Sequence, residues 1–308
     1  MADAIILDQV VKSFGEGHEE RVVAVDHLSL KIEKGEIFSL VGPDGAGKTT
    51  TIRMMCGVLA PTEGSISILG LDIQKQKSEV KKHIGYLSQR FSLYQDLTIE
   101  ENIDFFAEIH KVRKYEERKE ELLLFTRLTP FRDRLAGQLS GGMKQKLALA
   151  CTLIHTPEII FLDEPTTGVD PVSRRDFWKI LSSLLKSGIT IVICTPYLDE
   201  AERSTRVAMM NQGKILKCDT PEAIKSSFHA EVVEVVCDDV HRAAEILSRS
   251  FERNDIQLFG DRLHILLKDA KKEEGDIRRL LKAERIAVLN YRMIPPSLED
   301  VFIASLNV

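Results

Sequence analysis

Residues 42–50 read GPDGAGKTT, and this stretch decides most of what the sequence says about the fold. It fits the pattern G-x-x-x-x-G-K-[ST] through Gly42, Gly47, Lys48 and Thr49. The apolar β-type run IFSLV precedes it, and the helical run TIRMMCGVL follows, with apolar residues on one side at Ile52, Met55, Cys56 and Leu59. Strand, glycine-rich turn and helix form the context that a phosphate-binding loop requires. The sequence therefore predicts a nucleoside-triphosphate site rather than a chance glycine turn.

The residue types of this loop suit phosphate chemistry. Glycines let backbone N–H groups surround phosphate oxygens, and the following helix adds the positive end of its dipole. We expect Lys48 to reach the β- and γ-phosphates and the Thr49 hydroxyl to bind Mg²⁺. The predicted nucleotide-binding residues of the loop are Gly42, Asp44, Gly45, Gly47, Lys48, Thr49 and Thr50.

A second motif, IIFLDEP, occupies residues 159–165. Four apolar residues followed by two acids indicate a buried parallel strand with carboxylates at its C-terminal edge, where open α/β sheets bind ligands. We expect Asp163 to hold Mg²⁺ through water, and Glu164 to orient or deprotonate the attacking water. The alternative is a strand that merely ends in a solvated acid pair. The phosphate loop favours the metal site, because Mg²⁺·ATP needs this second carboxylate site.

A third motif, LSGGMKQK, covers residues 139–146. Two glycines after a serine open a helix whose pattern is amphipathic, with apolar positions at Met143, Leu147, Leu149 and Ala150. Such a helix start can bind an anion, although a plain serine cap is the alternative. One chain cannot easily place two phosphate-binding loops on one nucleotide. This loop is therefore predicted to contact a nucleotide held by another chain.

Together, these motifs resemble the ATP-binding subunit of an ABC transporter over about residues 5–220. LSGGMKQK resembles the ABC signature and IIFLDEP the Walker B strand. The resemblance implies ATP and Mg²⁺ as cofactors. It implies that Gln89 is the Q-loop glutamine, which is a catalytic residue and contacts Mg²⁺. It further implies nucleotide contacts from the adenine-stacking aromatic, the signature and the D-loop aspartate: Phe14, Ser140, Gly141, Gly142 and Asp170.

The chain departs from the family pattern at one position. The strand after Walker B in this family ends in a histidine that contacts the γ-phosphate and the catalytic carboxylate. Here the stretch reads IVICTPYLDEAERS, with Pro196 at that position and no histidine between His155 and His229. Proline supplies no side-chain donor and no backbone N–H. Thr195 or Tyr197 remain as alternative donors.

Composition limits the class of protein. The chain has 308 residues, a formal net charge of −5 and five cysteines, none in a C-x-x-C pair. The charge gives no indication of nucleic-acid binding, and the cysteines indicate reduced, buried thiols. Neither a secretory signal nor an apolar run of the ~20 residues that a spanning helix needs is present. We expect a cytoplasmic protein that is peripheral on the inner face of the cell membrane and acts there through a partner.

The sequence pattern predicts two domains. Residues 1–223 are expected to form an α/β P-loop NTPase domain of ABC ATPase type, with a mixed sheet core and a helical subdomain at about 90–150. Residues 224–308 have the order β-α-β-β-α-β, a split βαβ α+β domain. This accessory domain is interpreted as regulatory or dimer-contacting, and His241 and His264 as surface and strand residues rather than ligands. Its segment PPSLEDVF resembles the tail of drug- and polysaccharide-exporter (ABC-2 type) subunits.

Three functions stay open from the sequence. The first is an ATP-hydrolysing subunit that powers a separate ABC permease, for export, beside a second ATP-binding subunit. Pro196 favours an asymmetric pair in that case, while a slow homodimer is the alternative. The second is a regulatory subunit with little or no hydrolysis, and the third is a non-transport ABC ATPase. Permease contact is expected near the Q-loop, with Phe91, Leu93 and Tyr94 as candidates, although core packing is an equal alternative for Phe91.

Overall fold

The computed structural model describes residues 2–15, 21–89, 93–252 and 255–306. The chain divides into two compact units, Met1–Cys218 and Asp219–Val308. The sequence-based boundary lay after residue 223. Phe91 lies outside the described residues. So do residues 16–20, which belong to the stretch GEGHEER (residues 15–21) that the sequence predicts to be a solvated hairpin loop. Phe14 and Val22, on either side of that stretch, pair antiparallel.

A six-stranded sheet in the first unit carries the phosphate loop, with strand order β10-β9-β3-β8-β7-β6. Its strands are β3 (Ile37–Val41), β6 (Ile84–Leu87), β7 (Ile159–Asp163), β8 (Thr190–Thr195), β9 (Arg206–Asn211) and β10 (Lys214–Asp219). Strands β3, β6, β7, β8 and β9 pair in parallel. Since β3, β7 and β8 are buried along their whole lengths, they need the continuous apolar runs seen in the sequence. Their carboxyl ends meet at one edge of the sheet.

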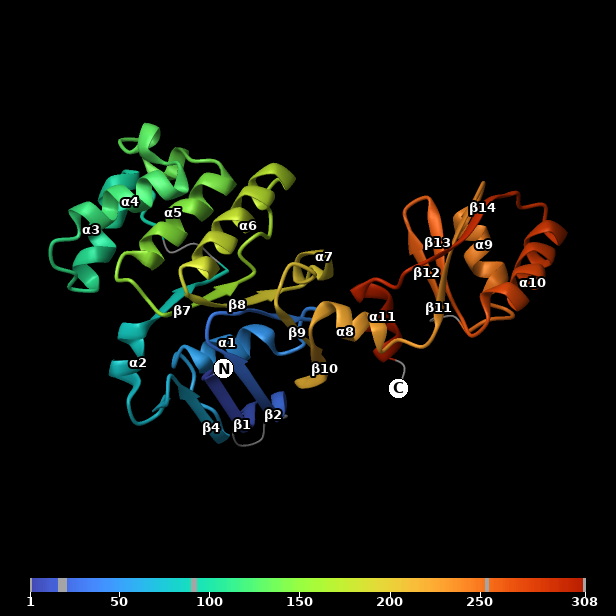
Figure 1. Cartoon of the computed structure of the whole chain (residues 1–308), viewed down its shortest axis with the longest axis horizontal. Coiled ribbons are helices and arrows are strands. Elements are labelled where there is room, and N and C mark those ends of the chain that lie inside the picture. The colour runs from blue at the N-terminus through green and yellow to red at the C-terminus, as the bar shows by residue number, and fades with distance from the viewer. Residues whose placement is uncertain (1, 16–20, 90–92, 253–254, 307–308) are drawn as a thin grey trace. The chain divides into compact units, whose positions relative to one another are not determined.

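A second, four-stranded sheet has the order β2-β1-β4-β5. It is antiparallel and contains β1 (Asp3–Phe14), β2 (Val22–Glu33), β4 (Glu63–Ile68) and β5 (Leu71–Asp72). Helix α1 (Lys48–Met55) packs between this sheet and the parallel one (Figure 1). The prediction that the helix reaches Leu59 is wrong. Gly57, at φ +65°, takes the left-handed conformation that ends a helix.

The predicted helical subdomain contains α3 (Ile99–Ile109), α4 (Glu116–Thr126) and α5 (Gly141–Leu153), which pack in one core with α6 (Pro171–Lys186). A capping box between Thr98 and Glu101 starts α3. The prediction of an amphipathic α5 is wrong, because Gln145 and Ala148 are buried as well as Leu147 and Leu149, so apolar neighbours surround most of the helix. Two shorter helices lie next to strands of the parallel sheet in sequence: α2 (Lys77–His83) precedes β6, and α7 (Leu198–Ala201) lies between β8 and β9.

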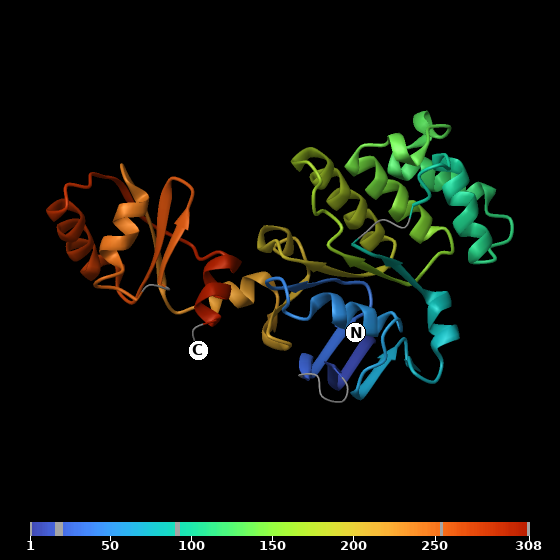
Figure 2. The ribbon, with the colours of Figure 1, turned by 180° about the vertical axis from the view of Figure 1, so that it is seen from behind.

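The second unit has the predicted strand and helix order. It contains β11 (Glu231–Cys237), α9 (Val240–Leu247), β12 (Ile256–Phe259), β13 (Arg262–Leu267), α10 (Ala270–Ala283) and β14 (Val288–Ile294), flanked by α8 (Pro221–Ser226) and α11 (Leu298–Ser305). Its antiparallel sheet has the order β12-β13-β11-β14. Figure 2 shows the unit from behind.

The strand residue His264 of this unit is part of a polar cluster. Its Nδ1 lies 3.1 Å from Oδ1 of Asp300 on α11, and Asp300 is fully buried. Beside them, Glu234 accepts hydrogen bonds from Arg292 (2.8 Å) and Arg262 (3.1 Å). The Arg292 hydrogen bond is the main cause of the lowered pKa of Glu234. His241 is an exposed residue of α9, as predicted.

Every helix in the described ranges is too short or too polar to span a bilayer.

Candidate nucleotide-binding site

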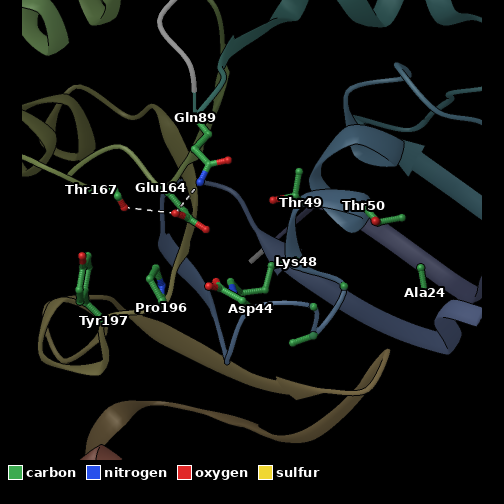
Figure 3. Close-up of a pocket in the computed structure, with 13 residues that line it drawn as sticks. Ala24, Asp44, Lys48, Thr49, Thr50, Gln89, Glu164, Thr167, Pro196 and Tyr197 are labelled. Carbon is green, nitrogen blue, oxygen red and sulfur yellow. Dashed lines mark hydrogen bonds between the residues drawn. The ribbon is translucent and has the colours of Figure 1, made fainter.

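A cavity of about 630 Å³ lies at the carboxyl edge of the parallel sheet (Figure 3). The phosphate loop forms one wall, and the segments that follow β6, β7 and β8 form the other. Its lining residues are Ala24, Asp44, Gly45, Ala46, Gly47, Lys48, Thr49, Thr50, Gln89, Glu164, Thr167, Pro196 and Tyr197. Six of the seven residues predicted in the loop thus line the cavity, and Gly42 does not.

Gly42 and Gly47 let the loop approach neighbouring backbone closely. A Cβ on Gly42 would lie 2.0 Å from the carbonyl oxygen of Met210, and one on Gly47 would lie 2.4 Å from that of Ala24. Gly47 also has φ +103°, which a side chain would strain. Both positions therefore require glycine.

Lys48 is held in the loop by two carbonyl groups. Its ammonium donates to the oxygens of Gly42 at 2.7 Å and Pro43 at 2.9 Å, and the residue is only 4% exposed. The positive charge is thus fixed beside the loop N–H groups, where an anion would gain from both.

Asp163 is fully buried at the end of β7. The Thr49 hydroxyl donates to its Oδ1 at 3.0 Å, and the Tyr86 hydroxyl donates to its Oδ2 at 3.4 Å. Burial raises the pKa of Asp163, because it disfavours the charged form. Burial, and then the nearby Asp163 charge, raise the pKa of Tyr86 to about 12. Tyr86 was not predicted, because its contact with Asp163 depends on the pairing of β6 with β7, which joins residues far apart in the sequence.

The paired oxygens of Thr49 and Asp163 fit Mg²⁺, which prefers hydroxyl, carboxylate and water ligands. A bound cation would also relieve the cost of burying the Asp163 charge. The third residue predicted at the metal is Gln89, whose side-chain amide Nε2 donates a hydrogen bond to Glu164 in this structure. Its contact with Mg²⁺ stays a prediction.

Glu164 enters the cavity from a turn directly after β7. Its φ of +48° lies in the left-handed region, which costs a non-glycine residue of order 1–3 kcal/mol. Its Oε2 accepts a hydrogen bond from Gln89 Nε2 at 2.9 Å and one from the Thr167 hydroxyl at 3.2 Å (Figure 3). A strained backbone with two side-chain donors indicates a carboxylate held for chemistry. Thr167 was not predicted, since only its contact with Glu164 distinguishes it.

Pro196 lies across the cavity from the phosphate loop, as Figure 3 shows. Of its two neighbours, Tyr197 lines the cavity, whereas Thr195 does not. The Thr195 hydroxyl donates to buried Glu200 at 3.3 Å and accepts from the Tyr197 N–H at 3.1 Å. Thr195 is therefore committed elsewhere as a donor.

The remaining predicted nucleotide contacts lie outside the cavity lining: Phe14, Ser140, Gly141, Gly142 and Asp170. Ser140 caps α5 by accepting from the Met143 N–H at 3.3 Å. Asp170 caps α6 through the N–H groups of Val172 and Ser173, and hydrogen bonds from Ser173 lower its pKa. Phe14 is 43% exposed at the end of β1. Their contacts with nucleotide stay predictions.

The two candidates for permease contact within the described residues differ in exposure. Tyr94 is 49% exposed and packs edge-on against Phe105. Leu93 is partly buried against the helical core.

Comparisons with known proteins agree with this geometry. Residues 25–167 match the ABC transporter family, and residues 220–306 match the C-terminal domain of DrrA1-3-like ATP-binding proteins. The Nod factor export ATP-binding protein I of Paraburkholderia xenovorans (strain LB400) is 36% identical over 304 residues, covering 97% of this chain and 96% of that protein. The daunorubicin resistance ATP-binding protein DrrA2 of Streptomyces coeruleorubidus is 32% identical over 307 residues, covering 97% and 94%.

This chain belongs to the ABC transporter ATP-binding proteins. Members of the family are ATPases, so the ABC ATPase assignment and the α/β P-loop fold made from the sequence are confirmed. The C-terminal match and these relatives also confirm the resemblance to exporter-type subunits.

Other matches cover about 70% of this chain. The probable multidrug ABC transporter ATP-binding protein YbhF of Escherichia coli (strain K12) is 40% identical over 220 residues, covering 71% of this chain but only 37% of YbhF. Among solved structures, the dimeric ATP-binding cassette MJ0796 bound to ADP and Pi has a TM-score of 0.64 and 29% identity, covering 70% of this chain and 98% of that one.

Proposed function

We propose that this chain binds Mg²⁺·ATP in the cavity and hydrolyses it to power a separate membrane permease for export. One observation carries the proposal: Lys48, Thr49 and Glu164 line a single cavity at the sheet edge, and the buried Asp163 accepts a hydrogen bond from Thr49 there. The names of the relatives support export, since they describe a Nod factor exporter and a drug resistance protein. In this role the chain works as a cytoplasmic protein on the inner face of the membrane.

Each residue has a chemical task in this proposal. The loop N–H groups and Lys48 bind and orient the β- and γ-phosphates. Thr49 and Asp163 hold Mg²⁺, which neutralises charge on the phosphate oxygens. Glu164 orients or deprotonates the attacking water, with Gln89 holding the carboxylate in place. Asp44 and Thr50 complete the phosphate side of the cavity.

A second ATP-binding subunit completes the site. Ser140, Gly141 and Gly142 lie outside this chain's cavity lining, so their anion-binding helix start is available to a nucleotide on another chain. The fold also resembles a cassette that was solved as a dimer. Asp170, at the start of α6, belongs to the same proposed contact surface.

Pro196 makes an asymmetric pair the favoured assembly. A positioned acid-base or electrostatic group contributes typically 10²–10⁴-fold to a rate, and proline provides none. A partner with a complete set of residues would then hold the faster site, which uses the signature of this chain. The same observation supports a second candidate, a regulatory subunit that binds ATP and hydrolyses little.

The proposed two-chain site is tested with Glu164→Gln, which removes the water-orienting carboxylate and keeps the shape of the side chain. We expect this variant to bind ATP and to form a stable ATP-dependent dimer, alone or with the partner subunit, by size-exclusion chromatography. Wild-type protein with ADP is the control and should elute as the smaller species. If ATP produces no dimer under either condition, the two-chain site is wrong.

A further inference from the structure

The hydrogen bonds of Glu164 point to Thr167, which was not among the predicted site residues. Both donors act on the same oxygen: Gln89 at 2.9 Å and Thr167 at 3.2 Å from Oε2. Gln89 adjoins residues outside the described part of the chain. Thr167 sits only three residues from Glu164 in a closed turn, in which the Thr167 N–H donates to the Glu164 carbonyl at 3.3 Å.

The loop that carries Thr167 is anchored by buried hydrogen bonds to Glu200. The hydroxyl of the preceding residue, Thr166, donates to both carboxylate oxygens of Glu200, at 2.6 and 2.7 Å. Thr166 and Glu200 are each 1% exposed. Arg174 adds an ion pair to the same carboxylate, with Nε 3.3 Å from Oε1. The Thr167 hydroxyl is therefore fixed in position by a buried contact of its neighbour.

The same carboxylate also fixes the loop of Pro196. Thr195 donates to Glu200 at 3.3 Å and accepts from the Tyr197 N–H at 3.1 Å. Pro196 is thus held at the cavity between two anchored residues, with no N–H or side-chain donor of its own. Glu200 therefore anchors both loops: the loop of Thr167, whose hydroxyl donates to Glu164, and the loop of Pro196, a residue that has no donor for Glu164.

We propose that Thr167 is a positioning residue for hydrolysis, and that its hydroxyl supplies the hydrogen bond to Glu164 that position 196 cannot. The role rests on the proposed function, in which Glu164 acts on the attacking water. A donor fixed before the reaction lowers the cost of orienting the carboxylate during it. Thr167 acts on Glu164 and not on ATP, so its loss changes turnover and leaves ATP affinity unchanged.

The first test compares Thr167→Val with Thr167→Ser in the full-length chain by single-turnover ATP hydrolysis. Valine keeps the branched shape and removes the hydroxyl, whereas serine keeps the hydroxyl. A hydrogen bond to a charged group is strong enough for a loss of about tenfold in rate with valine, with ATP affinity unchanged by titration. Serine should restore the rate to within about twofold of wild type, because its hydroxyl still donates.

Thr129→Val is the matched control. The Thr129 hydroxyl is buried and has no hydrogen-bond partner among the described residues, so its loss should leave the rate unchanged. A wild-type rate in Thr167→Val, or equal losses in Thr167→Val and Thr167→Ser, would overturn the positioning role.

The second test is a double-mutant cycle with Pro196→His. Imidazole offers a new donor at position 196, so it should raise the rate of Thr167→Val by a larger factor than it raises the rate of wild type. If Pro196→His raises the rate of Thr167→Val and of wild type by the same factor, positions 167 and 196 act independently. The proposal that Thr167 supplies the hydrogen bond missing at position 196 is then wrong. Glu164→Gln separates the two proposals. If this variant hydrolyses ATP at the wild-type rate, the proposed function is wrong. If Glu164→Gln loses activity while Thr167→Val keeps the wild-type rate, only the proposed role of Thr167 is wrong.

Discussion

The phosphate loop and the signature loop are both glycine-containing turns that open a helix, but they leave their helix starts in opposite states. Gly47 caps α1 without a side-chain hydrogen bond, so the first N–H groups of the helix depend on another acceptor. Ser140 caps α5 and accepts from the Met143 N–H. The first helix start lies in a 630 Å³ cavity with its own lysine, and the second lies outside that cavity's lining. The difference is consistent with the role proposed for the signature loop, which is to complete a site that another chain begins.

The largest effect that this comparison predicts is from Lys48→Ala. Lys48 provides the ammonium that the motif places on the β- and γ-phosphates, so we expect ATP affinity to fall by about 100-fold or to be lost. Isothermal titration with ATP and Mg²⁺ measures it. Lys144→Ala, the matched change in α5, should leave the ATP affinity of the isolated chain unchanged. An unchanged affinity in Lys48→Ala contradicts the phosphate-loop assignment.

Ser140→Arg should have the next largest effect, and only in the assembled complex. It places bulk and charge where the signature meets the nucleotide of the partner, so turnover should nearly stop. Glu164→Gln should leave much of the complex's activity, because in the proposed asymmetric pair it affects the slower of the two sites. Steady-state ATPase rates of the two complexes test this order. Equal losses would show that both sites turn over and that Pro196 is a tolerated variation.

The smallest effect is expected from Ser140→Ala in the isolated chain. It removes the cap of α5, which typically costs about 1 kcal/mol of stability, and it leaves the cavity intact. Urea denaturation should show the loss, while ATP affinity stays at the wild-type value. A change in ATP affinity of the isolated chain would place the signature in this chain's own site.

The sequence predicted the parts of the site that are local in the chain. Strand, glycine turn and lysine around residues 37–48 occur as expected, because contiguous residues decide each of them. The contact of Tyr86 with Asp163 was not predictable in the same way. It joins residues far apart in sequence and depends on the pairing of β6 with β7.

Predictions from the spacing of apolar residues were also wrong where an element is buried on more than one side. The spacing of apolar residues in α5 suggested one buried face, yet Gln145 is buried too, because helices and sheet enclose α5 on several sides. In the second unit the order of strands and helices along the chain was predictable from periodicity. The pairing of His264 with Asp300 was not, since it requires α11 to fold back onto the sheet.

Helices α8 and α11, the first and last of the second unit, pack against each other (Figure 1). The chain thus begins and ends this unit at neighbouring points, an arrangement that tolerates insertion and circular permutation. We therefore expect that residues 219–306 can be moved as a block, into a surface loop of an unrelated host protein, with both junctions a short linker apart.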